Sequence, residues 1–210
     1  MGLALRMYVE DNRNQYPFCY MNKTALSWED ALGLYYPLSW TTISSYLCPG
    51  YRGVISKWDP IGVYLGSYTY NAKGASWARN ALGVQVGLGF GNDLMGPAIT
   101  ESKVSVPTEM IVITDNGVQF VLHSPRFGYP AGTPVGDDIN DLWPSPTTAD
   151  PFAHIIQKPP QHGRNFNVLF CDAHVSPMSV TDLIQSSKSA SLWNYDHQPH
   201  REGWWQTPWP

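Results

Sequence analysis

The clearest alternation of apolar and polar residues lies between residues 162 and 175. One set of alternate positions is large and apolar and comprises Phe166, Val168 and Phe170. The other set comprises Asn165, Asn167, Leu169 and Cys171. Asp172 and Ala173 then form a two-residue corner before His174 and Val175, which predicts a tight β-hairpin with a type I′ turn. Ala173 stands where such a turn prefers glycine, at a cost of roughly 1 kcal/mol.

Two other segments have the pattern of strands. Residues 107–115 contain the continuous apolar run Ile111 to Ile113, which predicts a strand buried on both faces. Asp115-Asn116-Gly117 is a hairpin signal, so we expect residues 120–122 to return beside this strand. The alternation of Tyr68 and Tyr70 predicts a third strand over residues 67–71.

Helices are predicted at three places. Residues 2–12 have helical spacing, and we expect Leu3, Ala4, Met7 and Tyr8 to pack on the sheet. Ser27 is a candidate N-cap for a short helix that ends before Pro37. Ser179 and Thr181 are candidate caps for a last helix, with Val180, Leu183 and Ile184 on one face. Residues 40–48 fit either a strand or a helical turn.

The remaining stretches favour loops within one domain that spans residues 1–210. Residues 72–91 are rich in glycine, which tolerates close backbone approach, but their GLGFG segment lacks the spacing of a nucleotide-binding loop. Residues 124–161 are rich in proline and form a long loop or insertion, and residues 193–210 form a Trp-rich tail.

Composition narrows the range of functions. The chain has 210 residues, of which 43% are hydrophobic and 14% are charged, so it can bury one core of ordinary size. Its net charge of −4 gives no basic footprint for nucleic acid. No apolar run approaches the roughly 20 residues that span a bilayer.

Candidate chemistry is sparse. His162, Asp172 and His174 flank the predicted hairpin and could converge on a metal ion or on one another. We interpret them as a structural motif in which Asp172 bonds the backbone N–H groups of the turn. The three cysteines lack the spacing of a zinc site; Cys19 and Cys48 could form a disulfide in an oxidising compartment, or all three could be buried thiols.

A second candidate site is an acidic loop. Its oxygen-bearing residues are Asp137, Asp138, Asn140 and Asp141. Such side chains suit a hard cation, so Ca²⁺ is the one cofactor considered, although the spacing is not that of an EF-hand. The alternative is a solvated loop.

Several blocks of the sequence resemble a family of bacterial pseudopilins. His162, nine further residues and Asp172 resemble the H-x9-DG signature of these type II secretion and type IV pilus-like proteins, with Ala173 in place of the glycine. Other blocks follow in the family's order: Met1–Pro17 at the end of its N-terminal helix, Leu47–Pro49 at its CPS turn, Ser67–Ala72 at its SYGYN strand, Val106–Asp115 at its P-to-D strand, and Trp193–His197 at a tail seen in some members.

The resemblance implies an α+β, pilin-like fold, in which an N-terminal helix packs on an antiparallel sheet of about four strands. It also implies a non-catalytic subunit of a pseudopilus or pilus-like filament, which self-assembles through its N-terminal helix and meets other pseudopilins and inner-membrane secretion proteins. Such a subunit is processed by a prepilin peptidase and lies on the periplasmic or cell-surface side of the bacterial inner membrane. Major pseudopilins of this kind often hold Ca²⁺ beside the sheet, which favours the acidic loop as a site.

The first residues differ from that family. The basic leader, the processing site and the long apolar helix of pseudopilins do not occur in the sequence. Because no residue caps the helix at residues 2–12, we expect residue 1 to be a cut through a longer helix. Two other classes compete: a secreted carbohydrate- or ligand-binding module, favoured by nine Trp and 12 Tyr residues, and, less favoured, a metal hydrolase. The native residues before Met1 would discriminate between them.

Overall fold

A computed structural model describes residues 1–21, 23–24, 26–36, 48, 56–58, 63–65, 68–71, 74, 77–79, 85–91, 97–115, 118–120, 134–136, 162, 165–179, 182–183 and 186–200. Its helices are α1 (Gly2–Asp11), α2 (Trp28–Gly33), the 3-10 helix η1 (Glu101–Lys103) and α4 (Ser186–Trp193). Its strands are β1 (Tyr20–Met21), β2 (Leu26–Ser27), β3 (Ser56–Trp58), β4 (Val63–Leu65), β5 (Tyr68–Tyr70), β6 (Trp77–Arg79), β7 (Gln85–Gly87), β8 (Ile111–Asp115), β9 (Val118–Phe120), β10 (Pro134–Gly136), β11 (Asn165–Phe170) and β12 (Val175–Ser179).

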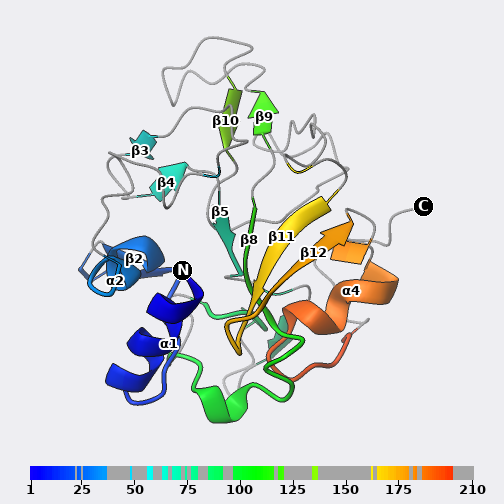
Figure 1. Ribbon diagram of the computed structural model, residues 1–210. Coiled ribbons are helices and arrows are strands. Elements are labelled where there is room, and N and C mark those ends of the chain that lie inside the picture. Colours follow the sequence, from blue (N-terminus) through cyan, green and yellow to red (C-terminus); the bar gives the residue numbers. More distant parts are fainter. Residues whose placement is uncertain are drawn as a thin grey trace.

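The fold is α+β and is built around one antiparallel sheet of four strands in the order β12-β11-β8-β5. Helix α1 lies on one side of this sheet and α4 on the other (Figure 1). The alternation predicted for β11 is confirmed, because Phe166, Val168 and Phe170 pack in one buried cluster while Leu169 and Cys171 pack in the other. The predicted burial of β8 is also confirmed, since all five of its residues are buried.

Helix α1 confirms the helix predicted for residues 2–12 but presents a different face to the sheet. Its buried residues are Ala4, Leu5 and Val9, and Tyr8 packs at the edge of the same cluster. Leu3 and Met7, which we expected on this face, are 74% and 42% exposed. The buried face is therefore rotated by about one residue, or 100°, from the face that we expected. Leu5 and Val9 lie on it in place of Leu3 and Met7.

The hairpin of β11 and β12 is confirmed, but its turn is not the predicted type I′. The N–H of Ala173 donates to the carbonyl of Phe170, and the N–H of Phe170 donates to the carbonyl of His174. Ala173 has a φ of 73°, and Cys171 and Asp172 are not in the left-handed region. This is a three-residue loop, in which an ordinary turn is followed by one left-handed residue. One left-handed alanine is less strained than a type I′ turn, which requires positive φ at two residues.

The partner of β9 also differs from the prediction. We expected residues 120–122 to return beside β8, but β9 pairs with β10. Both edges of β8 are already occupied, by β5 on one side and β11 on the other. The pairing of β9 with β10 gives the 124–161 region a strand, and the rest of that region lies outside the described residues.

The second predicted helix is confirmed as α2. The Ser27 hydroxyl accepts from the Asp30 N–H, and the Asp30 carboxylate accepts from the Ser27 N–H, so the two residues form a capping box. The Trp28 ring stacks on Tyr70 of β5, with ring centroids 5.5 Å apart, and thereby joins α2 to the central sheet. The predicted stop at Pro37 lies outside the described residues.

The cap predicted at Ser179 is confirmed, because its hydroxyl accepts from the Asp182 N–H. The start of the tail packs back on the fold: the Tyr195 N–H donates to the Leu88 carbonyl, and the Ser105 N–H donates to the Tyr195 carbonyl.

The glycine-rich stretch is more ordered than expected, since β6 and β7 form a short antiparallel pair within it. The expected close backbone approach occurs at Gly74, whose φ is +73° and where a Cβ atom would lie 2.7 Å from the backbone nitrogen of Gly89. No L-residue with a side chain fits this position without displacing the backbone.

Candidate functional site

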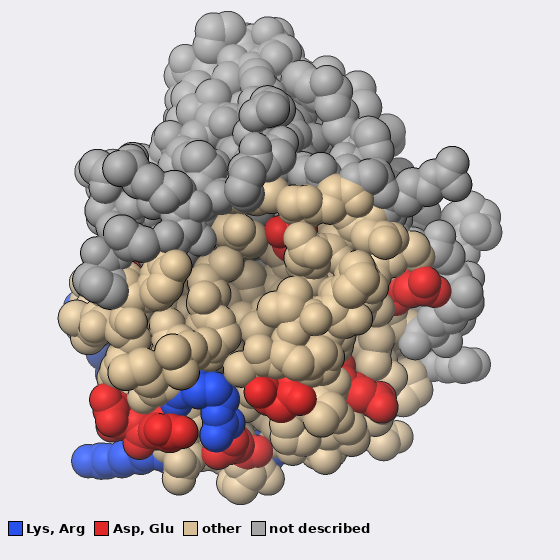
Figure 2. All heavy atoms as spheres, in the orientation of Figure 1, with Lys and Arg blue, Asp and Glu red and all other residues tan. Residues whose placement is uncertain are grey.

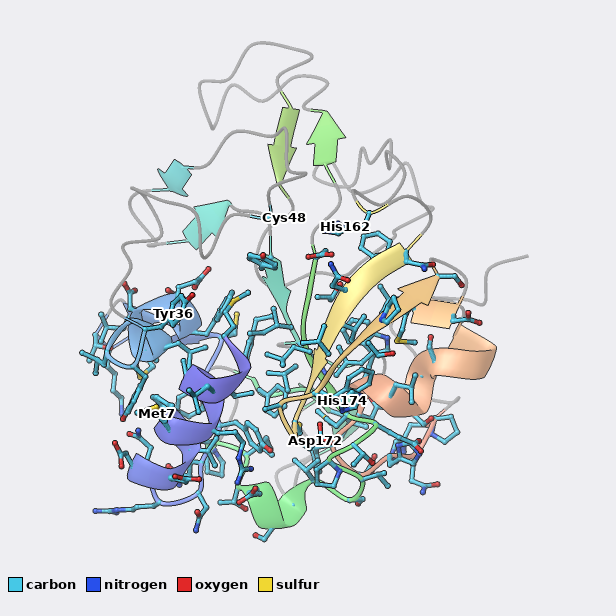
Figure 3. All side chains as sticks on the ribbon, in the orientation of Figure 1. Met7, Tyr36, Cys48, His162, Asp172 and His174 are labelled. Atoms are coloured by element: carbon cyan, nitrogen blue, oxygen red, sulfur yellow. The ribbon has the colours of Figure 1, made fainter. Side chains whose placement is uncertain are left out.

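Three chemically active side chains from distant parts of the sequence meet at one end of the central sheet. The Sγ atom of Cys48 lies 3.0 Å from Nε2 of His162. The same Nε2 atom lies 3.3 Å from Oδ2 of Asp115, and the three atoms all lie within 4.8 Å of one another. Figure 3 places Cys48 and His162 near each other beyond the upper ends of the strands.

The sheet positions Asp115. It is the last residue of β8, where it pairs with Tyr68 of β5. Its carboxylate accepts a hydrogen bond from the backbone N–H of Asn167 on β11, at 2.8 Å. Two neighbouring strands therefore fix the direction of the carboxylate.

His162 and Cys48 approach this carboxylate from outside the sheet. His162 forms an isolated bridge with Asn165, the first residue of β11, and its carbonyl accepts from the Asn165 N–H. The His162 side chain is 37% exposed and that of Asp115 is 2% exposed. Cys48 is also buried, so the cluster has a buried side and a side open to solvent.

Burial governs the ionisation of the surrounding groups. It raises the pKa of Asp115, although the hydrogen bond from Asn167 and the nearby His162 partly oppose this effect. It also raises the pKa of Tyr68, and the Asp115 and Cys48 groups raise the pKa of that phenol further. Asp115 is therefore a buried carboxylate whose charge is only partly compensated by the groups around it.

The geometry does not support a nucleophilic triad. In such a triad the acid orients the histidine through one ring nitrogen, while the nucleophile contacts the other. Here the thiol and the carboxylate both contact Nε2 of His162. Sulfur, imidazole nitrogen and carboxylate oxygen that converge on one point form a donor set for a borderline-soft divalent metal.

Comparison with family models, with curated proteins and with solved structures found no match to this chain. Among the described helices, none has the length and apolar character needed to cross a membrane.

The structure separates the three residues that the sequence grouped around the hairpin. Asp172 and His174 lie together at the turn, whereas His162 lies at the opposite end of β11, on the order of 20 Å away along the strand (Figure 3). The predicted role of Asp172 is confirmed, because its Oδ1 atom accepts from the His174 N–H at 3.1 Å. The same oxygen lies 2.6 Å from Nδ1 of the His174 ring, which stacks on Phe170.

The cysteines are buried, as one of the two alternatives proposed, and none of the three is in a disulfide. The Cys19–Cys48 pair considered from the sequence is not formed, because Cys48 directs its sulfur at His162. Burial raises the pKa of Cys171 to about 12, which keeps this thiol protonated and unreactive.

The acidic loop proposed for Ca²⁺, at Asp137, Asp138, Asn140 and Asp141, lies outside the described residues. Sequence reasoning singled out His162 but missed its two partners. Asp115 was interpreted as a turn residue, and Cys48 as either half of a disulfide or a buried thiol. The signal in the sequence was a carboxylate at the end of a strand whose apolar run, Ile111 to Ile113, indicates burial, since such a group is buried only with partners.

Proposed function

We propose that this chain is the head of a structural, non-catalytic subunit of a pseudopilus or type IV pilus-like filament. The sequence blocks that resemble pseudopilins support this proposal, and so does the arrangement of an N-terminal helix on an antiparallel sheet. The observation that carries it is the character of α1, which has apolar side chains on two sides.

One side of α1 holds the helix to its own head. Ala4, Leu5 and Val9 lie in one buried cluster with Ile113 and Leu169 of the central sheet. This side supplies the contact between helix and sheet that a rigid head requires.

The other side of α1 is apolar and open. Leu3 and Met7 are one helical turn apart, so they are neighbours on the surface, and Figure 3 shows Met7 on the side of α1 turned away from the sheet. Residues 1–5 carry no charged side chain. On the face drawn in Figure 2, most of the charged side chains lie toward the lower edge. The first charged residue of α1, Arg6, pairs with Glu101 of η1.

A second copy of the chain is the partner that fits this surface in our proposal. Contacts of one copy's α1 with a different surface of the next copy would repeat and build an open helical filament. The subunit would be held in a bacterial inner membrane only by an apolar extension of α1, with its head on the periplasmic or cell-surface side. Its other partners would be further pseudopilins and inner-membrane secretion proteins, and it would not bind nucleic acid.

The competing ligand-binding module gains no support from the tryptophans whose side chains are described. Trp28 stacks on Tyr70 in the core, and Trp193 is buried and donates from Nε1 to the Leu183 carbonyl. Neither ring is available as a platform for a sugar.

The test is assembly in cells that express the complete gene. The Leu3→Glu/Met7→Glu variant should abolish filaments seen by electron microscopy, because charge at a buried subunit contact is unfavourable. The stability of the isolated head should change by no more than about 0.5 kcal/mol, as is usual for surface substitutions.

A matched control is Val175→Glu on β12, where the native side chain is 61% exposed. This variant should assemble like the native chain. Native cells without filaments, or a double variant that assembles as well as the native chain, would refute the proposal.

A further inference from the structure

We infer that Cys48, Asp115 and His162 form a binding site for one zinc ion, with a solvent molecule in the fourth position. This inference goes beyond the filament role and does not depend on it. The three residues hold the sulfur, oxygen and nitrogen donors that zinc takes most often in proteins.

The distances fit such an ion. In a tetrahedral site with ordinary bond lengths, sulfur and nitrogen ligands are about 3.5 Å apart, and nitrogen and oxygen ligands about 3.4 Å apart. Cys48 Sγ and His162 Nε2 are 3.0 Å apart, and His162 Nε2 and Asp115 Oδ2 are 3.3 Å apart. These two separations lie within about 0.5 Å of the zinc values, and the Cys48 sulfur lies within 4.8 Å of a carboxylate oxygen of Asp115.

A hydrogen bond from the backbone holds one of the three ligands in place. The Asp115 carboxylate is oriented by the Asn167 N–H, which acts as an outer partner behind the ligand. The carboxylate is buried and its side chain is only 2% exposed, so its position is fixed by the protein around it. The exposed side of His162 leaves a route for the ion and room for a solvent ligand.

The donor set selects the metal. Thiolate and imidazole are poor ligands for Ca²⁺ and Mg²⁺, which take oxygen, and are good ligands for zinc. The site is thus chemically distinct from the acidic loop at residues 137–141. When zinc binds, the Cys48 thiol gives its proton to the buffer and the sulfur binds as thiolate.

The expected consequence is a metal-dependent stability. Cys48, Asp115 at the end of β8 and His162 in the segment that leads to β11 are far apart in sequence, and one ion would connect all three. A ligand that binds only the folded chain raises the melting temperature by mass action.

Zinc binding can be measured on the chain itself, after removal of metals with a chelator that is then removed by dialysis. Titration of ZnCl2 against a competing chromophoric chelator should give one ion per chain. The melting temperature should rise with zinc. Cys48→Ser should weaken binding by more than about 100-fold, beyond the 10- to 100-fold typical for loss of an outer partner.

Two further variants make the result specific. Cys171→Ser removes another buried thiol, which lies in the turn after β11 and outside the cluster, and this variant should bind zinc like the native chain. Asp115→Asn keeps an oxygen that can accept from Asn167 but removes the charge, so it should bind more weakly while its circular dichroism stays native.

Cobalt provides a direct probe of the sulfur. The Co²⁺ form of the native chain and of Cys171→Ser should show thiolate-to-cobalt absorption in the near ultraviolet, and Cys48→Ser should lose it. The inference is overturned if the native chain binds no zinc in competition with the chelator, or if a folded Cys48→Ser binds it equally well. Neither result bears on filament assembly, so the two proposals can fail separately.

Discussion

Gly2 touches the hairpin turn through Ala173. A Cβ atom placed on Gly2 would lie 2.8 Å from the carbonyl oxygen of Ala173 and 3.2 Å from its Cβ atom. The first residue of α1 is therefore packed against the turn between β11 and β12, and its lack of a side chain is what permits this contact.

Gly2→Ala should destabilise the fold. The new methyl group meets backbone that cannot move alone, so the helix must shift from the turn, at a cost of about 1 to 3 kcal/mol. Denaturant unfolding measures the difference. Gly33→Ala is the control, since no atom lies within 4 Å of a Cβ there, and it should be neutral or stabilising by up to about 1 kcal/mol. Equal effects of the two substitutions would contradict the contact.

Ala173→Gly should be neutral or stabilising by up to about 1 kcal/mol. Ala173 has a φ of 73°, a conformation that costs alanine more than glycine. Ala190→Gly in α4 should instead lose about 1 kcal/mol, because glycine is unfavourable within a helix. Thermal melts of both variants test this contrast, and a clear loss of stability in Ala173→Gly would show that the turn does not adopt this conformation.

The stability contributed by Asp172 should depend on pH. Burial acts to raise the pKa of this carboxyl group, but hydrogen bonds from the His174 ring and N–H outweigh burial and lower the pKa below its ordinary value. An acid with a lowered folded pKa stabilises the fold above its unfolded value, about 3.9, and loses this contribution as pH falls through the folded value. The native chain should therefore be more stable than Asp172→Asn near pH 6.

This advantage should shrink as the pH is lowered from about 5 to 2. Asparagine keeps an oxygen that can accept from the His174 N–H, so the comparison isolates the charge. Asp115, whose pKa is raised, is present in both chains and does not affect the difference. If the melting temperatures of the native chain and of Asp172→Asn differ by the same amount over this pH range, the role of the charge is refuted.

Asn71 should be among the most sensitive polar residues. Its amide nitrogen donates to the carbonyls of Ile111 and Trp193, each at 2.8 Å, and its amide oxygen accepts from the Gly74 N–H. Asn71→Ala leaves these groups without their partner in a buried place, at a cost of about 2 to 4 kcal/mol.

Asn12→Ala is the matched control. The Asn12 side chain donates to the Tyr8 carbonyl at the partly exposed end of α1, where water can replace it, so the loss should stay below about 1 kcal/mol. Urea unfolding of both variants decides the order, and a reversed order would contradict the role assigned to Asn71.

Local features of the fold were predictable from the sequence. The capping box at Ser27, the alternation from Phe166 to Phe170 and the buried run of β8 each depend on residues close together in the chain. The turn at Ala173 was missed because a type I′ turn and a three-residue loop differ by a single residue in length.

The long-range features were not predictable. The partner of β9 depends on which edges of β8 are occupied, and that is decided by β5 and β11. The face of α1 depends on a rotation of one residue, which a ten-residue helix with apolar side chains on two sides does not fix. The cluster at His162 joins three segments through tertiary structure, so no spacing in the sequence marks it.

The strand order also bears on how the chain reaches this structure. Within the four-stranded sheet, only β11 and β12 are consecutive in the sequence, whereas Tyr70 and Leu169 both pair with Ile113 across long intervening segments. Closing such loops lowers the conformational entropy of the chain before the new contacts stabilise it, and folding rates fall as contacts become less local. We therefore expect the hairpin of β11 and β12 to form early. The slow step should be the pairing of β8 with β5 and β11.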